Sequence, residues 1–382
     1  MAEHCSPTFA DLATQLGFSC AEAGGLVEFR SPFALENWTL PVLELTIIVG
    51  AVLALWFAIV RLRRHGDPTN LVLWFGATAY LFVIEPPLYF PAAFGIEDHV
   101  DTMFAHNVFT VDFLWGRLPL YIVAIYPLMA TMAFGLVRML GIFRQYGVLI
   151  GAACVGFVHH AFYEIFDHLG PQLRWWEWTT ENPINQPMFD SVPMGSVVVF
   201  AALWPMSLAF CVQYFVGRHV DDGRRFSGVE LTWRTVVIGL LASVGTFLLP
   251  LPATVIGLAG DTVRGVVYAL ELLTLSVVAV VAMTRQWRRL RAGSAPEPYV
   301  DRFVQIYTVV YLIVFAVLWI ASLPDFFDAV DGRTANGDPI GNLWYTLACF
   351  VIAILSILAT WTLPRPTDSA PEPAPERTAV TG

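Results

Sequence analysis

Nine apolar runs of about 20 residues recur along this 382-residue chain, and they constrain its fold more than any other feature. A helix of about 20 residues, rising about 1.5 Å per residue, matches the roughly 30 Å hydrocarbon core of a bilayer. The chain is 57% hydrophobic and only 14% charged, which is unusual for soluble domains. We therefore predict an all-α, polytopic membrane bundle with spans near Pro41–Val60, Asn70–Glu85, Arg117–Val137, Val148–His168, Ser196–Val216, Thr235–Leu251, Val266–Met283, Phe303–Leu323 and Leu343–Trp361.

Arginine predicts the orientation of the bundle, because all 21 basic side chains are Arg and the chain contains no Lys. Sixteen of these arginines fall on the side of the carboxyl terminus, and five fall on the other side. Basic residues are enriched in cytoplasmic connections, so we expect the amino terminus outside and the carboxyl terminus in the cytoplasm. The expected location is a cell membrane, which we interpret as a bacterial plasma membrane.

Three regions follow from this pattern. Residues 1–39 form a short external segment, residues 40–363 form the transmembrane domain, and residues 364–382 form a disordered, Pro-rich cytoplasmic tail. Within the first region, Phe9, Leu12 and Leu16 have helical spacing, which fits a short amphipathic helix as well as a loosely ordered tail. Cys5 and Cys20 can form a disulfide if this segment is external.

The fourth run carries an ionisable cluster of His159, His160, Glu164, Asp167 and His168 near its outer end. Ionisable groups within a membrane are costly, so they usually face a bundle interior or a wet cavity and mark functional sites. Residues 160, 164 and 167 share one helical stripe, and His159 points elsewhere. An i, i+4 His and carboxylate pair suits either a metal site or acid–base chemistry.

A metal hypothesis adds residues from the external connection before the third span. His99 and His106 lie on the same side of the membrane as His160, Glu164 and His168. Such nitrogen and oxygen ligands suit one divalent Zn, Mn or Fe ion. A solvated or hydrogen-bonded histidine is the simpler alternative, so the cofactor stays open.

Ionisable residues also concentrate in the outer halves of other spans, as with Glu85, Asp112, Arg117 and Glu271. The inner halves contain no ionisable group in stretches such as LMATMAFGLV. This asymmetry predicts a polar cavity at the outer side above an apolar floor. Arg117 is expected to pair with Asp112 or with a carboxylate of a neighbouring helix.

The polar segment after the cluster contains Trp175, Trp176 and Trp178. Tryptophan prefers the membrane interface, so these residues can form an aromatic belt. The functional alternative is a lid over the cavity.

Our leading hypothesis is a membrane-embedded enzyme acting on a lipid or isoprenoid-like molecule. Glu164 would be the general acid or base, His160 its partner, and Asp167 an orienting residue or ligand. An ion- or proton-coupled transporter and a noncatalytic membrane scaffold remain alternatives. The expected partners are membrane lipids, and the net charge of −10 gives no reason to expect nucleic acid binding.

Overall fold

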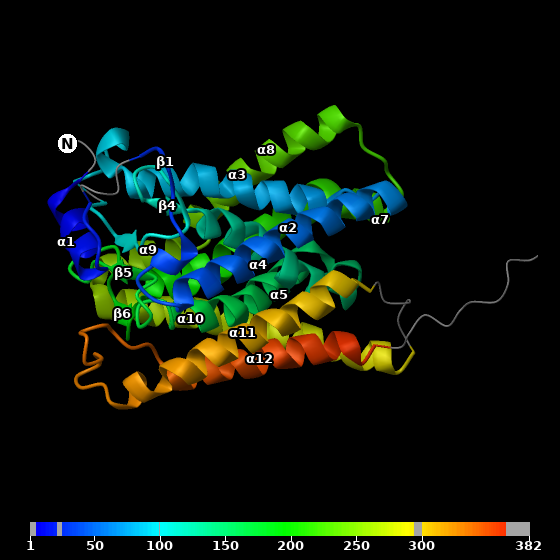
Figure 1. Cartoon of the computed structure of the whole chain (residues 1–382). Coiled ribbons are helices and arrows are strands. Elements are labelled where there is room, and N and C mark those ends of the chain that lie inside the picture. The colour runs from blue at the N-terminus through cyan, green and yellow to red at the C-terminus, as the bar shows by residue number, and fades with distance from the viewer. Residues whose placement is uncertain (1–4, 21–24, 99, 294–299, 364–382) are drawn as a thin grey trace, which may run out of the picture.

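The computed structural model describes residues 5–20, 25–98, 100–293 and 300–363, and the predicted tail 364–382 lies outside them. Within these residues, nine helical segments are long and apolar enough to cross a membrane. The predicted polytopic helical bundle is therefore confirmed (Figure 1). Seven of the segments are single helices, namely α2 (Thr39–His65), α3 (Thr69–Tyr89), α4 (Leu120–Met139), α5 (Ile142–Asp167), α10 (Asp261–Arg291), α11 (Arg302–Phe327) and α12 (Leu343–Trp361).

The remaining two segments are composite. The first runs from Ser196 to Asp221 and joins η3 (Ser196–Leu203), α6 (Trp204–Val212), η4 (Gln213–Gly217) and α7 (Arg218–Asp221). The second joins α8 (Gly228–Leu248), α9 (Leu251–Ile256) and η5 (Gly257–Ala259). The run near Thr235–Leu251 is thus a genuine long apolar helix.

Helices α4 and α5 form the centre of the bundle. In their apolar windows 89% and 78% of residues are buried, compared with 22% in α10. Both central helices pack on several others, and α10 and α12 cover α5 from outside. The ionisable cluster on α5 is therefore deep within protein, not at a lipid-facing surface.

Two helix boundaries can be compared with the limits predicted from hydropathy. Gly147 has φ +82° inside α5, a left-handed conformation that favours glycine, so the regular part of this helix begins at the predicted Val148. Helix α3 continues through Pro86 and Pro87 to Tyr89, four residues beyond Glu85, where the predicted span ends. The prolines remove donors only in the last turn, where few helical bonds remain to be lost.

Segment η3 is a π-helix, which the sequence analysis did not predict. Pro205 follows it in α6. In an α-helix the N–H of residue 205 would bond to the Ala201 carbonyl, and proline has no such N–H. The wide helix and the proline together leave the Ala201 carbonyl available to a side chain.

Short strands form a layer at the end of the bundle that carries α1 (Figure 1). Strand β1 (Val27–Phe29) pairs with β3 (Val111–Phe113), which pairs with β4 (Leu118–Pro119). Strand β2 (Phe104–His106) pairs with β5 (Trp176–Trp178), and β6 (Met188–Phe189) pairs with β7 (Val192–Pro193). All these pairs are antiparallel. The short helices η1 (Pro32–Ala34) and η2 (Pro91–Phe94) complete the layer.

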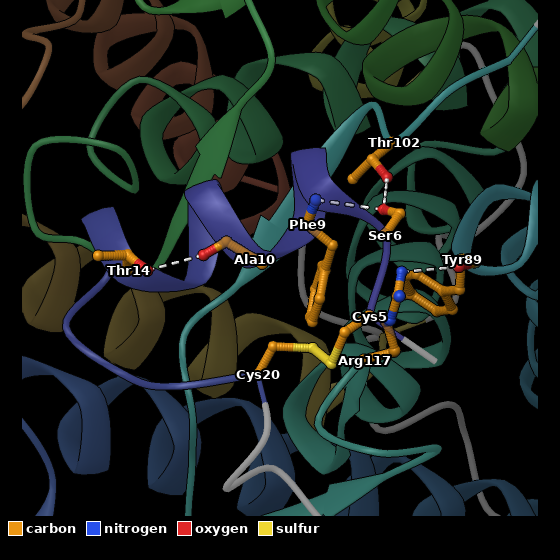
Figure 2. Close-up of a disulfide and its surroundings, with 9 residues drawn as sticks. All are labelled: Cys5, Ser6, Phe9, Ala10, Thr14, Cys20, Tyr89, Thr102 and Arg117. Carbon is orange, nitrogen blue, oxygen red and sulfur yellow. Dashed lines mark hydrogen bonds between the residues drawn. A yellow bond between two sulfur atoms is a disulfide. The ribbon is translucent and has the colours of Figure 1, made fainter. Parts of the chain in front are cut away.

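Helix α1 (Pro7–Gln15) lies on this layer, which supports the amphipathic helix over a loose tail. Its apolar face is buried through Phe9, Leu12 and Leu16. Cys5 and Cys20 form the predicted disulfide beside it, as Figure 2 shows. The helix thus packs on protein instead of lying on lipid.

The opposite end of the bundle carries the arginine-rich helix ends. There Asp67 joins the α2–α3 turn to α4, accepting from Arg61 at 2.8 Å and from Arg138 at 2.7 Å. Burial opposes ionisation of Asp67, but the two arginines hold its pKa well below the usual range.

Candidate functional site

The ionisable cluster of α5 is divided between two faces of the helix. His159, Tyr163 and Asp167 line a cavity, since residues four apart lie on the same face. His160 and Glu164 do not line it. The structure therefore groups Asp167 with His159 instead of with His160.

The space between the lining atoms is about 630 Å³ when its open mouth is included, and about 60 Å³ is open to the centres of water-sized molecules. It lies toward the strand layer, where α3 and α5 end and α4 begins. The aliphatic part of the wall consists of Ile122, Ile125 and Met129. The polar groups belong to Glu85, His106, His159, Asp167 and Ser196. Eight aromatic side chains complete the lining: Phe104, Tyr126, Tyr163, Phe166, Trp176, Trp178, Phe200 and Trp204.

His159 is fixed through one ring nitrogen. Its Nδ1 lies 2.7 Å from the carbonyl oxygen of Ala201, the group left available by Pro205. A carbonyl oxygen only accepts, so Nδ1 carries the proton and, in the neutral ring, Nε2 holds a lone pair. No described residue hydrogen-bonds to this buried Nε2. His159 is therefore oriented as an acceptor of hydrogen bonds or protons.

Asp167 and Glu85 are each fixed through one carboxyl oxygen. Ser196 donates to Oδ2 of Asp167 at 2.6 Å, and Tyr126 donates to Oε1 of Glu85. The other oxygens, Oδ1 and Oε2, have no hydrogen-bond partner among the described residues. Tyr89 lies beside Glu85 without the geometry of a hydrogen bond. Both carboxyl groups thus retain one oxygen for another molecule.

Strands β2 and β5 cover the cavity at its extramembrane end. Trp176 is opposite His106 in their register, and Trp178 is opposite Phe104. The indole N–H groups of both tryptophans have no acceptor within the described residues. Burial lowers the pKa of His106 to about 3, so this histidine is neutral near pH 7.

Trp176 and Trp178 line the cavity at the end that the strands cover. Trp176 is buried and packs on Phe166 with ring centroids 4.7 Å apart. Trp175 is also buried, but its indole N–H donates to Thr39 at 2.9 Å and it does not line the cavity. Strand β5, paired with β2, therefore covers the cavity.

A second polar group connects α5 to α12. Tyr345 donates its hydroxyl to Nε2 of His160 at 2.7 Å, because Nδ1 of that ring faces the Val197 carbonyl at 3.0 Å. Nε2 of His168 lies 3.3 Å from Glu164 without hydrogen-bond alignment. Two of the three predicted catalytic residues, His160 and Glu164, thus lie at a helix–helix contact beside the cavity.

The other predicted cavity residues lie elsewhere. Asp112 pairs with Arg30 instead of Arg117, and burial raises the pKa of Asp112 to about 7 despite that arginine. Arg117 donates to the Tyr89 carbonyl at 2.8 Å and lies over the Phe9 ring (Figure 2). Glu271 accepts from the backbone N–H of Ala253 at 3.3 Å.

The five predicted metal ligands are not brought together as a set. His106 lines the cavity, whereas His160, Glu164 and His168 lie on the α12 side of α5. His99 lies outside the described residues. Within the described residues, no group of three or more His, Cys, Asp or Glu side chains is arranged to hold a metal ion.

His159 was predicted as a member of the ionisable cluster but not assigned a role in the site, and Ser196, Tyr126 and most of the aromatic wall were not predicted. Pro205 carried a usable signal, because a proline in a span frees the carbonyl four residues earlier. Comparison of the chain with protein-family models, curated proteins and solved structures finds no match.

Proposed function

We propose that this multi-pass membrane protein is an enzyme whose active site is the cavity between α3, α4, α5 and η3. One observation supports this most directly. Glu85, His159 and Asp167 are each held by the protein through one polar atom, and the other polar atom of each has no partner among the described residues. An unpaired buried polar atom costs about 1–3 kcal/mol, so three such atoms around one cavity fit a site built for a ligand.

In this proposal the chemistry is proton transfer. A carboxyl group of Asp167 or Glu85 donates a proton to the substrate, and Nε2 of His159 accepts one. The indole N–H groups of Trp176 and Trp178 hold an oxygen atom of the substrate or of water. The predicted roles of Glu164 and His160 then shift to positioning, since these residues lie on the α12 side of α5 and do not line the cavity.

The proposed substrate is a lipid or isoprenoid-like molecule. The wall is mainly aromatic and aliphatic, and the cavity lies within a membrane bundle. An apolar molecule dissolved in the bilayer matches such a wall, and the few polar groups would orient its reactive part.

Lipid analysis of cells lacking the protein tests this function. Wild type, Asp167→Asn and Glu85→Gln are reintroduced at equal abundance, with Glu271→Gln as a matched control because Glu271 does not line the cavity. We expect a lipid that accumulates in the deletion strain to be consumed with wild type and Glu271→Gln only. Full conversion by both cavity variants would refute the proposal.

A further inference from the structure

We infer that the cavity recognises a positively charged centre on an apolar molecule. This inference rests on the proposed function, since it names the ligand class of the same site. It comes from the composition of the lining. Most lining side chains are apolar, and the aromatic and polar groups among them favour positive charge over negative charge.

The aromatic wall is the first observation. Eight of the sixteen lining residues carry an aromatic ring of Phe, Tyr or Trp. Tyr126 and Trp204 contribute one pair with centroids 5.2 Å apart, and Phe104 and Trp178 contribute another at 5.2 Å. Aromatic faces carry negative potential and attract cations, most strongly when water is excluded. Aliphatic side chains would bind a neutral chain equally well without this property.

The polar groups are the second observation. Asp167 is 0% exposed and Glu85 is 5% exposed, and each has one oxygen without a partner among the described residues. Nε2 of His159, which has no partner in the described part of the chain, presents a lone pair. Carboxylates and lone pairs stabilise positive charge and repel negative charge.

The third observation concerns positive groups. No Arg or Lys lines the cavity within the described residues. His106 is kept neutral by burial, and Arg30 is occupied by Glu28 and Asp112 outside the cavity. The carboxyl groups of Glu85 and Asp167 therefore have no basic side chain as a neighbour in the lining, and a bound cation would supply their counter-charge.

Two ligand types share this chemistry. A lipid with a resident ammonium group is one, and a neutral lipid that becomes cationic when a carboxylic acid protonates it is the other. Both place positive charge at the same carboxyl oxygens and rings. Binding of a stable cation tests the shared chemistry without requiring turnover.

The test compares two probes of the same shape in nanodiscs of zwitterionic lipid. Decyltrimethylammonium carries the charge, and 2,2-dimethyldodecane replaces its nitrogen with carbon. A change in tryptophan emission on displacement of water from the cavity reports binding, because Trp176, Trp178 and Trp204 line the cavity. Cation–π attraction of about 0.5–2 kcal/mol predicts about tenfold tighter binding of the ammonium probe. Equal affinities, or no binding of the ammonium probe, would overturn the inference.

Four variants locate the effect. Asp167→Asn and Phe200→Leu should each weaken ammonium binding by about three- to tenfold and leave the neutral probe unchanged. Glu271→Gln and Phe210→Leu are the matched controls, since neither residue lines the cavity. Equal weakening by the controls would place the cation elsewhere and refute the inference.

Turnover separates this inference from the proposed function. Tight, cavity-dependent ammonium binding with lipid conversion intact in both Asp167→Asn and Glu85→Gln would support the cation site and refute the assignment of the cavity as the active site. Loss of lipid conversion in Asp167→Asn, together with equal affinities for the ammonium and the neutral probe, would support the proposed active site and refute the cation site. If the lipid consumed is neutral and the ammonium probe inhibits its conversion, the positive charge forms only during the reaction.

Discussion

At the scale of single residues, the site depends on Glu85, His159 and Asp167. Each is hydrogen-bonded to the protein through one polar atom, and its other polar atom has no partner among the described residues. The ionisable residues were predictable from the sequence because charge is rare in membrane spans, and Glu85 and Asp167 both lie where that rule indicates. The choice between His159 and His160 was not predictable. It depends on where the carbonyls of Ala201 and Val197 lie, which is set by the π-helical geometry of η3.

Gly170 supports the packing of Trp176 through its lack of a side chain. A Cβ atom there would lie 2.0 Å from the ring of Trp176, which is closer than any packed contact. We expect Gly170→Ala to displace Trp176 and lower the free energy of unfolding by about 1–3 kcal/mol, because the site is overpacked.

Thermal unfolding in detergent measures this change. Gly228→Ala is the control, since a Cβ atom at Gly228 meets nothing within 4 Å. Equal melting temperatures for Gly170→Ala and wild type would show that Trp176 accommodates the methyl group.

At the scale of elements, the spans were predictable and the extramembrane layer was not. Hydropathy identifies a run of about 20 residues reliably, and even the start of the regular part of α5 at Val148 was correct. Strands β2 and β5 contain three residues each, and the paired residues His106 and Trp176 are 70 positions apart in the sequence, so no local pattern reveals them.

Helix α1 is attached to the layer by a disulfide as well as by packing. Cys5 and Cys20 are 15 residues apart, and closing a loop of this size restricts the unfolded chain by about 3 kcal/mol. The double variant Cys5→Ser, Cys20→Ser should therefore unfold at a lower temperature than wild type under oxidising conditions.

A reducing agent is the internal control for this measurement. It should lower the melting temperature of wild type to that of the double variant and leave the variant unchanged. A wild-type protein insensitive to reduction would show that the disulfide adds no stability.

Asp67 in the α2–α3 turn should make the stability of the protein depend on pH. The folded-state pKa of Asp67 is depressed, so its ion pairs stabilise the protein above the unfolded pKa of about 3.9 and lose this effect as pH falls below it. We expect Asp67→Asn to be less stable than wild type at pH 6, with the difference narrowing below pH about 4. A difference that does not change with pH would contradict the ionic explanation.

At the scale of the whole molecule, the strand layer and the arginine-rich helix ends lie at opposite ends of the bundle (Figure 1). The number of spans and this polarity follow from composition, because each span must satisfy its own backbone. The position of the cavity required the packing of α4 and α5 at the centre, which hydropathy does not encode.

Orientation in the membrane is testable with introduced cysteines. Asp331 lies in the exposed connection between α11 and α12, and Arg225 lies between α7 and α8 at the other end. In intact cells, a membrane-impermeant maleimide should label Asp331→Cys and should label Arg225→Cys only after permeabilisation. The opposite labelling pattern would invert the predicted orientation.

The contacts of α1 also set an order of assembly. Ser6 bonds to Thr102, Phe9 packs under Arg117, and Gln15 accepts from Arg174. Helix α1 precedes α2 to α5 in the chain, so it is synthesised before its docking surface exists and cannot pack until those helices have been inserted. Until then Cys5 and Cys20 remain open to any oxidant or competing thiol on that side of the membrane.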